Sequence, residues 1–283
     1  MKKVNPAEAY WNKRCMIADL TDRFDQLSEA IGFENDLNTY QWAQLSAFVL
    51  EYQPDLVVEL GRKHGNSTCL FTETVRHLPS ACQVVSICWS NEFEQKTIPK
   101  LLEKNLIDKE WMTGLSCVTA DIRGYDYASL LAKYDRVILF WDAHGFDVAS
   151  CVIGGILPLL ERKEHYVLMH DLSDQRYMCD DLYRYNGSRL WHGDSHSGER
   201  LVLGHINSAV AQAVSIYDFC SRNRIWIESA DHTIHELFGD KEKKVEMENI
   251  LGERYFSFQG HWFFLSLNEW AGPFTYPSWK PEN

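Results

Sequence analysis

Short runs of apolar, largely β-branched residues recur along the chain, separated by longer segments of mixed polarity. Five runs are nearly continuous, which is typical of strands covered on both faces of a parallel sheet. They are Leu56–Leu60, Gln83–Cys88, Ser116–Ala120, Arg136–Trp141 and Tyr166–His170. The pattern predicts two further strands at Arg224–Glu228 and Trp262–Leu267, which could close the sheet as an antiparallel pair.

The segments between the first five runs are long enough for crossover helices, at Thr68–His77, Ile98–Leu106 and Val148–Glu164. Alternation of strand and helix predicts an α/β fold with a doubly wound, mostly parallel, seven-stranded sheet. Residues 1–50 place aromatic side chains among helix-compatible neighbours. They indicate a helical N-terminal extension or cap on the sheet, with a separate binding module as the alternative. Residues 51–283 then form one Rossmann-like domain.

Charge and composition narrow the class of partner. The chain has 28 Lys and Arg against 40 Asp and Glu in 283 residues, a net charge of −12. This balance argues against a protein that follows nucleic-acid phosphates. A hydrophobic content of 45% is ample for a large core. The most apolar stretch, Val148–Leu160, is shorter than the roughly 20 residues of a membrane span and contains glycine and proline. We therefore expect no membrane partner.

The N-terminal lysines are not followed by an apolar segment, so the sequence predicts no secretory signal. The eight cysteines form no C-x-x-C pair. Free, largely buried thiols in a reducing cytoplasm are the expectation.

The turn after the first predicted strand is the most informative segment. It reads Glu59-Leu-Gly61-Arg-Lys63-His-Gly65-Asn-Ser67, an acidic residue followed by a glycine-bounded turn and a helix start. Gly61 can adopt a positive φ and bring backbone amides close to a ligand. A nicotinamide-binding G-x-G-x-x-G turn would have glycine where Lys63 stands, so the pattern disfavours an NAD-dependent oxidoreductase, which stays as an alternative.

This turn resembles the E-x-G-x-x-x-G-x-S variant of class I S-adenosylmethionine-dependent methyltransferases. The variant occurs in metal-dependent O-methyltransferases and in the group of cephalosporin-hydroxylase-like, macrolide and rhamnosyl O-methyltransferases. The resemblance spans about residues 55–175. It implies that Glu59, Gly61, Gly65 and Ser67 surround the methionine part of S-adenosylmethionine.

The resemblance also assigns the ends of the next two strands. The second strand would end in an acidic residue that holds the ribose, but Cys88 stands there. Ser90, Glu92 or Glu94 could reach the ribose instead, and the mismatch also leaves open a non-catalytic or cofactor-free protein of this fold. After the third strand, Asp121 would accept from the adenine amino group, or act as an ordinary helix cap.

The fourth and fifth strands end in polar side chains. Asp142 and His144 are two residues apart and so project to one side, while Asp171 follows the neighbouring strand. By resemblance, Asp142 and Asp171 are metal-binding acids, and His170 stands where a third ligand is often found. Oxygen-rich ligation favours Mg²⁺ or another hard divalent ion. A hydrogen-bonded polar cluster at the sheet edge is the alternative.

A polar stretch at residues 177–200 includes His192-Gly-Asp194-Ser195-His196. It could ligate a metal but is more typical of a loop that closes over substrate. Ser195 and Ser197 lack a G-x-S-x-G turn, which argues against a serine hydrolase.

The sequence thus predicts a cytoplasmic S-adenosylmethionine-dependent methyltransferase, assisted by a divalent ion and acting on a hydroxyl of a small molecule. Asp142 would contact both cofactor and metal, and His144 would be the general base. The substrate, the metal and the oligomeric state, a homo-oligomer included, stay open.

Overall fold

A computed structural model describes residues 3–32, 37–170, 172 and 211–280 of the protein. Strands β1 (Leu56–Leu60), β2 (Gln83–Cys88), β3 (Leu115–Thr119), β4 (Arg136–Trp141) and β5 (Glu164–His170) are parallel. Strand β7 (Trp262–Leu265) runs antiparallel to β5 and to the two-residue β6 (Glu228–Ser229). The order is β3-β2-β1-β4-β5-β7-β6. The predicted doubly wound, mostly parallel seven-stranded sheet is confirmed, in the arrangement of class I methyltransferases.

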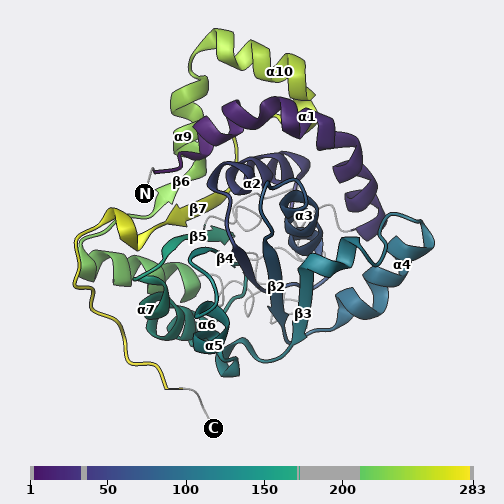
Figure 1. Ribbon diagram of the computed structural model, residues 1–283. Coiled ribbons are helices and arrows are strands. Elements are labelled where there is room, and N and C mark those ends of the chain that lie inside the picture. The colour runs from purple at the N-terminus through teal and green to yellow at the C-terminus, as the bar shows by residue number, and fades with distance from the viewer. Residues whose placement is uncertain (1–2, 33–36, 171, 173–210, 281–283) are drawn as a thin grey trace, which may run out of the picture.

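Helices cover both faces of the sheet (Figure 1). One face carries α1 (Pro6–Ile31), α2 (Thr39–Tyr52), α3 (Asn66–Val75), α9 (Ala230–Phe238) and α10 (Lys241–Tyr255). The other carries α5 (Tyr127–Leu131), α6 (Phe146–Cys151), a π-helical turn at Val152–Ile156, α7 (Leu157–Leu160) and helical residues within 211–223. A π-helical turn η1 (Phe93–Thr97) leads into α4 (Ile98–Glu103). Short 3₁₀ turns occupy Trp111–Gly114, Ile122–Gly124 and Leu267–Glu269.

The central strands are buried on both faces, which explains their nearly continuous apolar sequences. Val57 packs into the α1–α2–α3 layer, whereas Leu56, Val58 and Leu60 pack into the opposite layer. Successive side chains of a strand point to opposite faces, so burial on both sides needs an apolar residue at nearly every position. No helix among the described residues is long and apolar enough to cross a membrane.

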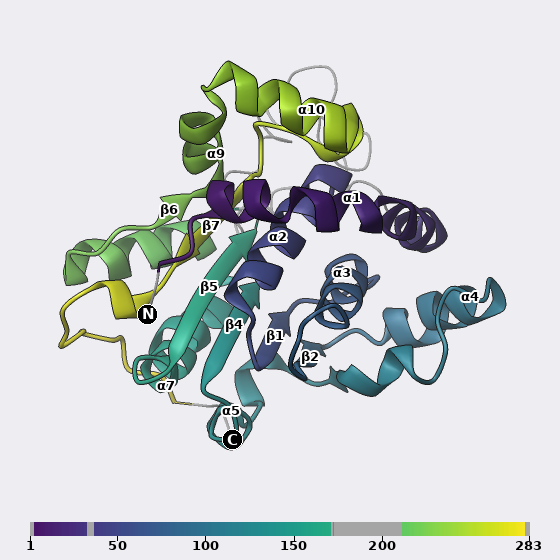
Figure 2. The ribbon, with the colours of Figure 1, turned by 45° about the horizontal axis from the view of Figure 1, so that its top comes forward.

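The N-terminal helices belong to this core. Helix α1 lies across α2 and beside α10 (Figure 2). Trp42 and Phe48 of α2 are wholly buried, and the Phe48 ring contacts Tyr166 of β5 and Trp262 of β7 edge-on. Helix α2 continues to Tyr52, past the predicted boundary at residue 50. The division into an extension and a domain stays a prediction.

Two sequence-based assignments need comment. Seven of the cysteines lie in the described part of the chain and all seven are free thiols, as predicted. The strand predicted at Arg224–Glu228 is present but displaced: β6 comprises only Glu228–Ser229, and it pairs antiparallel with β7 as expected. Arg224 has a φ of 56° and the Ile225 amide donates to the Cys220 carbonyl at 3.0 Å, so this backbone closes the preceding helix.

A buried histidine at the start of β5 gives the fold a pH-dependent contact. His165 is fully buried, its Nε2 accepts from the Leu267 amide at 3.1 Å, and Nδ1 lies 2.9 Å from the Lys163 carbonyl. Burial lowers the pKa of His165. The neutral ring therefore stabilises the fold fully above its unfolded pKa of about 6.5, and this contribution is lost as the pH falls below that value.

We expect His165→Gln, which can still accept from Leu267, to remove this dependence. The wild-type free energy of unfolding should fall more steeply than that of the variant between pH 7 and 5, by at most about 1.4 kcal/mol per pH unit. Urea denaturation at several pH values measures it. Parallel curves for the two proteins would show that His165 does not titrate with folding.

Candidate active site

The carboxyl ends of the parallel strands form the candidate active site. Strand β1 lies between β2 and β4, so the chain reverses its direction across the sheet beside β1. Ligands of open α/β sheets bind at this reversal, beyond the carboxyl ends of the strands. The loop 61–65, the residues that follow β4 and the last residue of β5, His170, lie there.

Both glycines of the loop have positive φ, 98° at Gly61 and 87° at Gly65. A Cβ at Gly61 would stand 2.8 Å from the Asp142 carbonyl oxygen, and one at Gly65 would overlap the Phe93 ring. The glycines therefore allow the end of β4 and the Phe93 ring to pack against the loop. Their predicted contact with a cofactor stays a prediction.

Glu59 is wholly buried at the β1–α3 junction. Its carboxylate accepts hydrogen bonds from the hydroxyls of Ser67, Thr68 and Ser86. Burial raises the pKa of Glu59, although these hydroxyls act in the opposite direction. The acidic residue and the serine of the motif thus bond to each other and join α3 to β1 and β2. Their contact with the methionine part of a cofactor stays a prediction.

The sequence analysis missed the role of Arg62, whose side chain is 0% exposed. It donates to the Ser86 carbonyl at 2.6 Å and to both carboxylate oxygens of Glu94, at 3.2 and 2.7 Å. Glu94 also accepts from the Thr119 hydroxyl at 3.1 Å. Arg62 therefore fixes a carboxylate beyond the ends of β2 and β3.

The end of β2 presents one buried and one exposed side chain. Cys88 is buried, and its sulfur accepts from the Ser90 amide at 3.4 Å. The next residue, Trp89, is 83% exposed, and Phe146 beyond the end of β4 is 66% exposed. Two exposed aromatic side chains therefore lie just beyond the carboxyl ends of β2 and β4.

Asp121 has the helix-cap role that was the alternative to adenine binding. Its carboxylate accepts from the Arg123 amide at 2.9 Å and pairs with the Arg123 guanidinium at 2.7 Å. These hydrogen bonds lower the pKa of Asp121. Its side chain is 53% exposed, and its contact with adenine stays a prediction.

Asp142 and His170 meet where β4 and β5 end. Asp142 Oδ1 lies 3.3 Å from His170 Nδ1, and His170 Nε2 lies 3.1 Å from Nε2 of Gln41 on α2. The Asp142 side chain is 16% exposed and that of His170 7%. The pairing of β4 with β5 brings these two residues together, and Gln41 adds a contact from the N-terminal helices.

His144 has a different partner. Its Nδ1 lies 2.7 Å from Oε1 of the fully buried Gln212, whose amide nitrogen donates to the Trp141 carbonyl at 3.4 Å. This amide orientation makes Oε1 the acceptor, so the neutral His144 ring carries its proton on Nδ1 and its lone pair on Nε2. A ring held in this tautomer suits a general base.

The predicted metal centre is only partly described. Asp171, the stretch 192–196, Ser195 and Ser197 lie outside the described residues. Within the described ranges there is no group of three or more His, Cys, Asp or Glu side chains that could hold an ion. The metal, its ligands Asp142, Asp171 and His170, and the meeting of Asp142, His144 and Asp171 in one pocket stay predictions.

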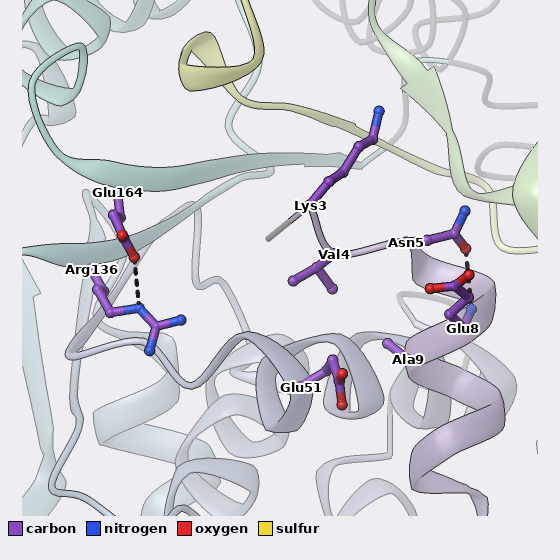
Figure 3. Close-up of a pocket in the computed structure, with 8 residues that line it drawn as sticks. All are labelled: Lys3, Val4, Asn5, Glu8, Ala9, Glu51, Arg136 and Glu164. Atoms are coloured by element: carbon purple, nitrogen blue, oxygen red, sulfur yellow. Dashed lines mark hydrogen bonds and ion pairs between the residues drawn. The ribbon is translucent and has the colours of Figure 1, made fainter. Parts of the chain in front are cut away.

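A cavity of about 190 Å³ lies at the other end of the strands (Figure 3). Arg136 and Glu164, the first residues of β4 and β5, form an ion pair of 3.1 Å on its wall. Lys3 on the N-terminal segment also lines it and pairs with Glu228 and Glu269. It therefore lies apart from the candidate active site.

No family model and no curated protein matches the chain. Several solved structures do match the chain. An S-adenosylhomocysteine-bound methyltransferase of Podospora anserina, PaMTH1, is 12% identical over 74% of this chain and 81% of its own, with a TM-score of 0.47. The O-methyltransferase from Bacillus cereus in complex with S-adenosylhomocysteine is 13% identical over 73% and 82%, with a TM-score of 0.43.

TomG of Streptomyces achromogenes, an O-methyltransferase involved in tomaymycin synthesis and solved with S-adenosylmethionine, is 14% identical over 71% of this chain and 80% of its own, with a TM-score of 0.40. The strand order of the sheet, with its antiparallel β7, is what gives this chain the class I methyltransferase-like fold.

Proposed function

We propose that the protein transfers a methyl group from S-adenosylmethionine to a hydroxyl of a small molecule. The observation that carries the proposal is the E-x-G-x-x-x-G-x-S turn at the reversal point of the sheet, next to a strand that ends in Asp142 and His144. The turn would bind S-adenosylmethionine. The two polar residues would bind and deprotonate the acceptor hydroxyl. The net charge of −12 favours a small molecule over a nucleic acid.

The residues present fit the cofactor. Trp89 offers an exposed aromatic surface beyond β2. Gly61, with its positive φ, has no side chain between the turn at the reversal point and a ligand. Glu94 takes the ribose role that Cys88 cannot fill, because Arg62 and Thr119 hold its carboxylate beyond the ends of β2 and β3. Glu92 is the weaker candidate because its partner at 2.6 Å, Lys96, is 61% exposed and does not hold the carboxylate as the buried Arg62 holds Glu94.

S-adenosylmethionine supplies a methyl group on a positively charged sulfur, and the acceptor oxygen displaces that sulfur in line. Asp142 binds the acceptor hydroxyl and places its oxygen for attack. His144 takes the hydroxyl proton on Nε2 while Gln212 holds Nδ1. A divalent ion on Asp142 and Asp171 stays a prediction, and the steps given to Asp142 and His144 do not depend on it.

Calorimetry with S-adenosylhomocysteine tests the cofactor proposal. We expect wild-type protein to bind it with at least micromolar affinity, and Mg²⁺ to leave that affinity nearly unchanged, because an ion at Asp142 would contact the acceptor. Absence of heat with the folded protein would favour a non-catalytic protein of this fold. Binding of NADH instead would favour the oxidoreductase.

His144→Ala tests the general base. We expect the rate of methyl transfer to fall by about 10²- to 10⁴-fold, the usual range for one base, with unchanged affinity for S-adenosylhomocysteine. His232→Ala is the matched control, since His232 is exposed on α9. Equal rates in the two variants would remove His144 from the mechanism.

A further inference from the structure

The contacts of His170 define its protonation. Nδ1 of the ring faces Asp142 Oδ1 at 3.3 Å, and Nε2 faces Gln41 Nε2 at 3.1 Å. Both ring nitrogens are thus engaged by side chains from outside β5, one directly after β4 and one on α2. Which nitrogen carries the proton follows from the orientation of the Gln41 amide.

Two backbone groups fix that amide. Gln41 Oε1 accepts from the Asn38 amide at 2.8 Å, and Gln41 Nε2 donates to the Gly260 carbonyl at 2.8 Å. A flipped amide would set two donors against each other at Asn38 and two acceptors at Gly260. Gln41 is only 3% exposed, so water could not relieve that mismatch. Gln41 therefore presents an N–H to His170.

Because His170 Nε2 must accept this hydrogen bond, its proton lies on Nδ1, which donates to Asp142. We propose that His170 is a positioning residue for Asp142 rather than a metal ligand, held by Gln41 as the neutral Nδ1–H tautomer. The proposal rests on the methyltransferase function for its catalytic consequence, but the tautomer itself can be measured without it.

The arrangement matters because Asp142 Oδ1 is then occupied by a fixed donor. Within the described residues Asp142 Oδ2 makes no hydrogen bond or ion pair, so Oδ2 is the oxygen that would meet the acceptor. Partners that orient metal-ligating side chains typically change activity about 10- to 100-fold when mutated, and we expect an effect of the same size for a partner that orients a reacting carboxylate. The contact from α2 also makes the N-terminal helices part of the site.

The first test is NMR of protein with ¹⁵N-labelled histidine, in which the His170 signals are assigned by their loss in His170→Asn. We expect a ring protonated at Nδ1 and unprotonated at Nε2. A ring protonated at Nε2 would overturn the proposal, because it could not accept from Gln41.

The second test compares two isosteric replacements. The amide nitrogen of Asn reaches the place of Nδ1, whereas that of Gln reaches the place of Nε2. We expect His170→Asn to keep kcat within about threefold and His170→Gln to lower it by about 10- to 100-fold, with equal thermal stability and equal S-adenosylhomocysteine affinity. Equal kcat values in the two variants would overturn the proposal.

The link to Asp142 is tested in the background of Asp142→Asn. If His170 acts through Asp142, adding His170→Gln to that variant should cost less than threefold, since effects that share one partner are not additive. If the two substitutions lowered kcat by the full product of their separate effects, His170 would not act through Asp142. Wild-type protein without any methyl transfer would refute the proposed function, while the NMR result would still decide the tautomer.

Discussion

Replacing Asp142 by Asn should lower the rate of methyl transfer by at least about 10²-fold, the range for loss of one preorganised electrostatic contact. The change keeps the volume of the side chain but removes the charge that meets the acceptor hydroxyl. Affinity for S-adenosylhomocysteine should stay near wild type, because that ligand carries no acceptor. Steady-state kinetics and calorimetry on the same preparation measure the two quantities.

Asp147→Asn is the matched control. Asp147 lies in the first turn of α6, and its side chain is 68% exposed and only 3.4 Å from Arg123. We expect the control to retain wild-type kinetics, since exposed ion pairs contribute little. Full activity of the Asp142→Asn enzyme would show that Asp142 does not act on the acceptor hydroxyl. A loss of cofactor affinity in parallel with the rate would show the same.

The second large effect is expected at Gly61. A valine there would adopt a φ near 98°, and its Cβ would stand 2.8 Å from the Asp142 carbonyl oxygen. Backbone strain alone costs at least about 1–2 kcal/mol for a residue with a side chain. The end of β4 must also move. We expect Gly61→Val to abolish binding of S-adenosylhomocysteine and to lower the melting temperature.

Gly61→Ala and Gly124→Ala form the matched pair if the valine variant does not fold. A Cβ at Gly124 would meet no atom within 4 Å. Calorimetry should then show weakened binding for Gly61→Ala and wild-type binding for Gly124→Ala. Wild-type affinity in a folded Gly61→Val protein would show that the loop does not border the cofactor.

The central strands could be predicted because burial on both faces leaves a local signal. The bounds of β1, β2 and β4 agree with the sequence analysis at both ends. The strand expected at Arg224–Glu228 begins only at Glu228, for a physical reason. Arg224 ends a helix with positive φ, a place where glycine is usual, so no glycine marks the boundary.

The site was only partly predictable because its contacts join distant segments. Asp142 follows β4 and His170 ends β5, and the pattern locates both strand ends. Gln41 meets His170 across 129 positions, and Gln212 meets His144 across 68. A single glutamine on a helix has no spacing or composition that marks it as a site residue. The Arg62–Glu94 pair is likewise visible only once β1 and η1 are placed side by side.

Because Gln41 contacts His170, local unfolding of α2 is coupled to the geometry at the ends of β4 and β5. When α2 opens, His170 loses the partner that fixes its ring. A ligand that binds only the closed arrangement must therefore stabilise α2 by mass action. Amide hydrogen exchange should slow throughout residues 39–52 when such a ligand binds, and not at Gln41 alone.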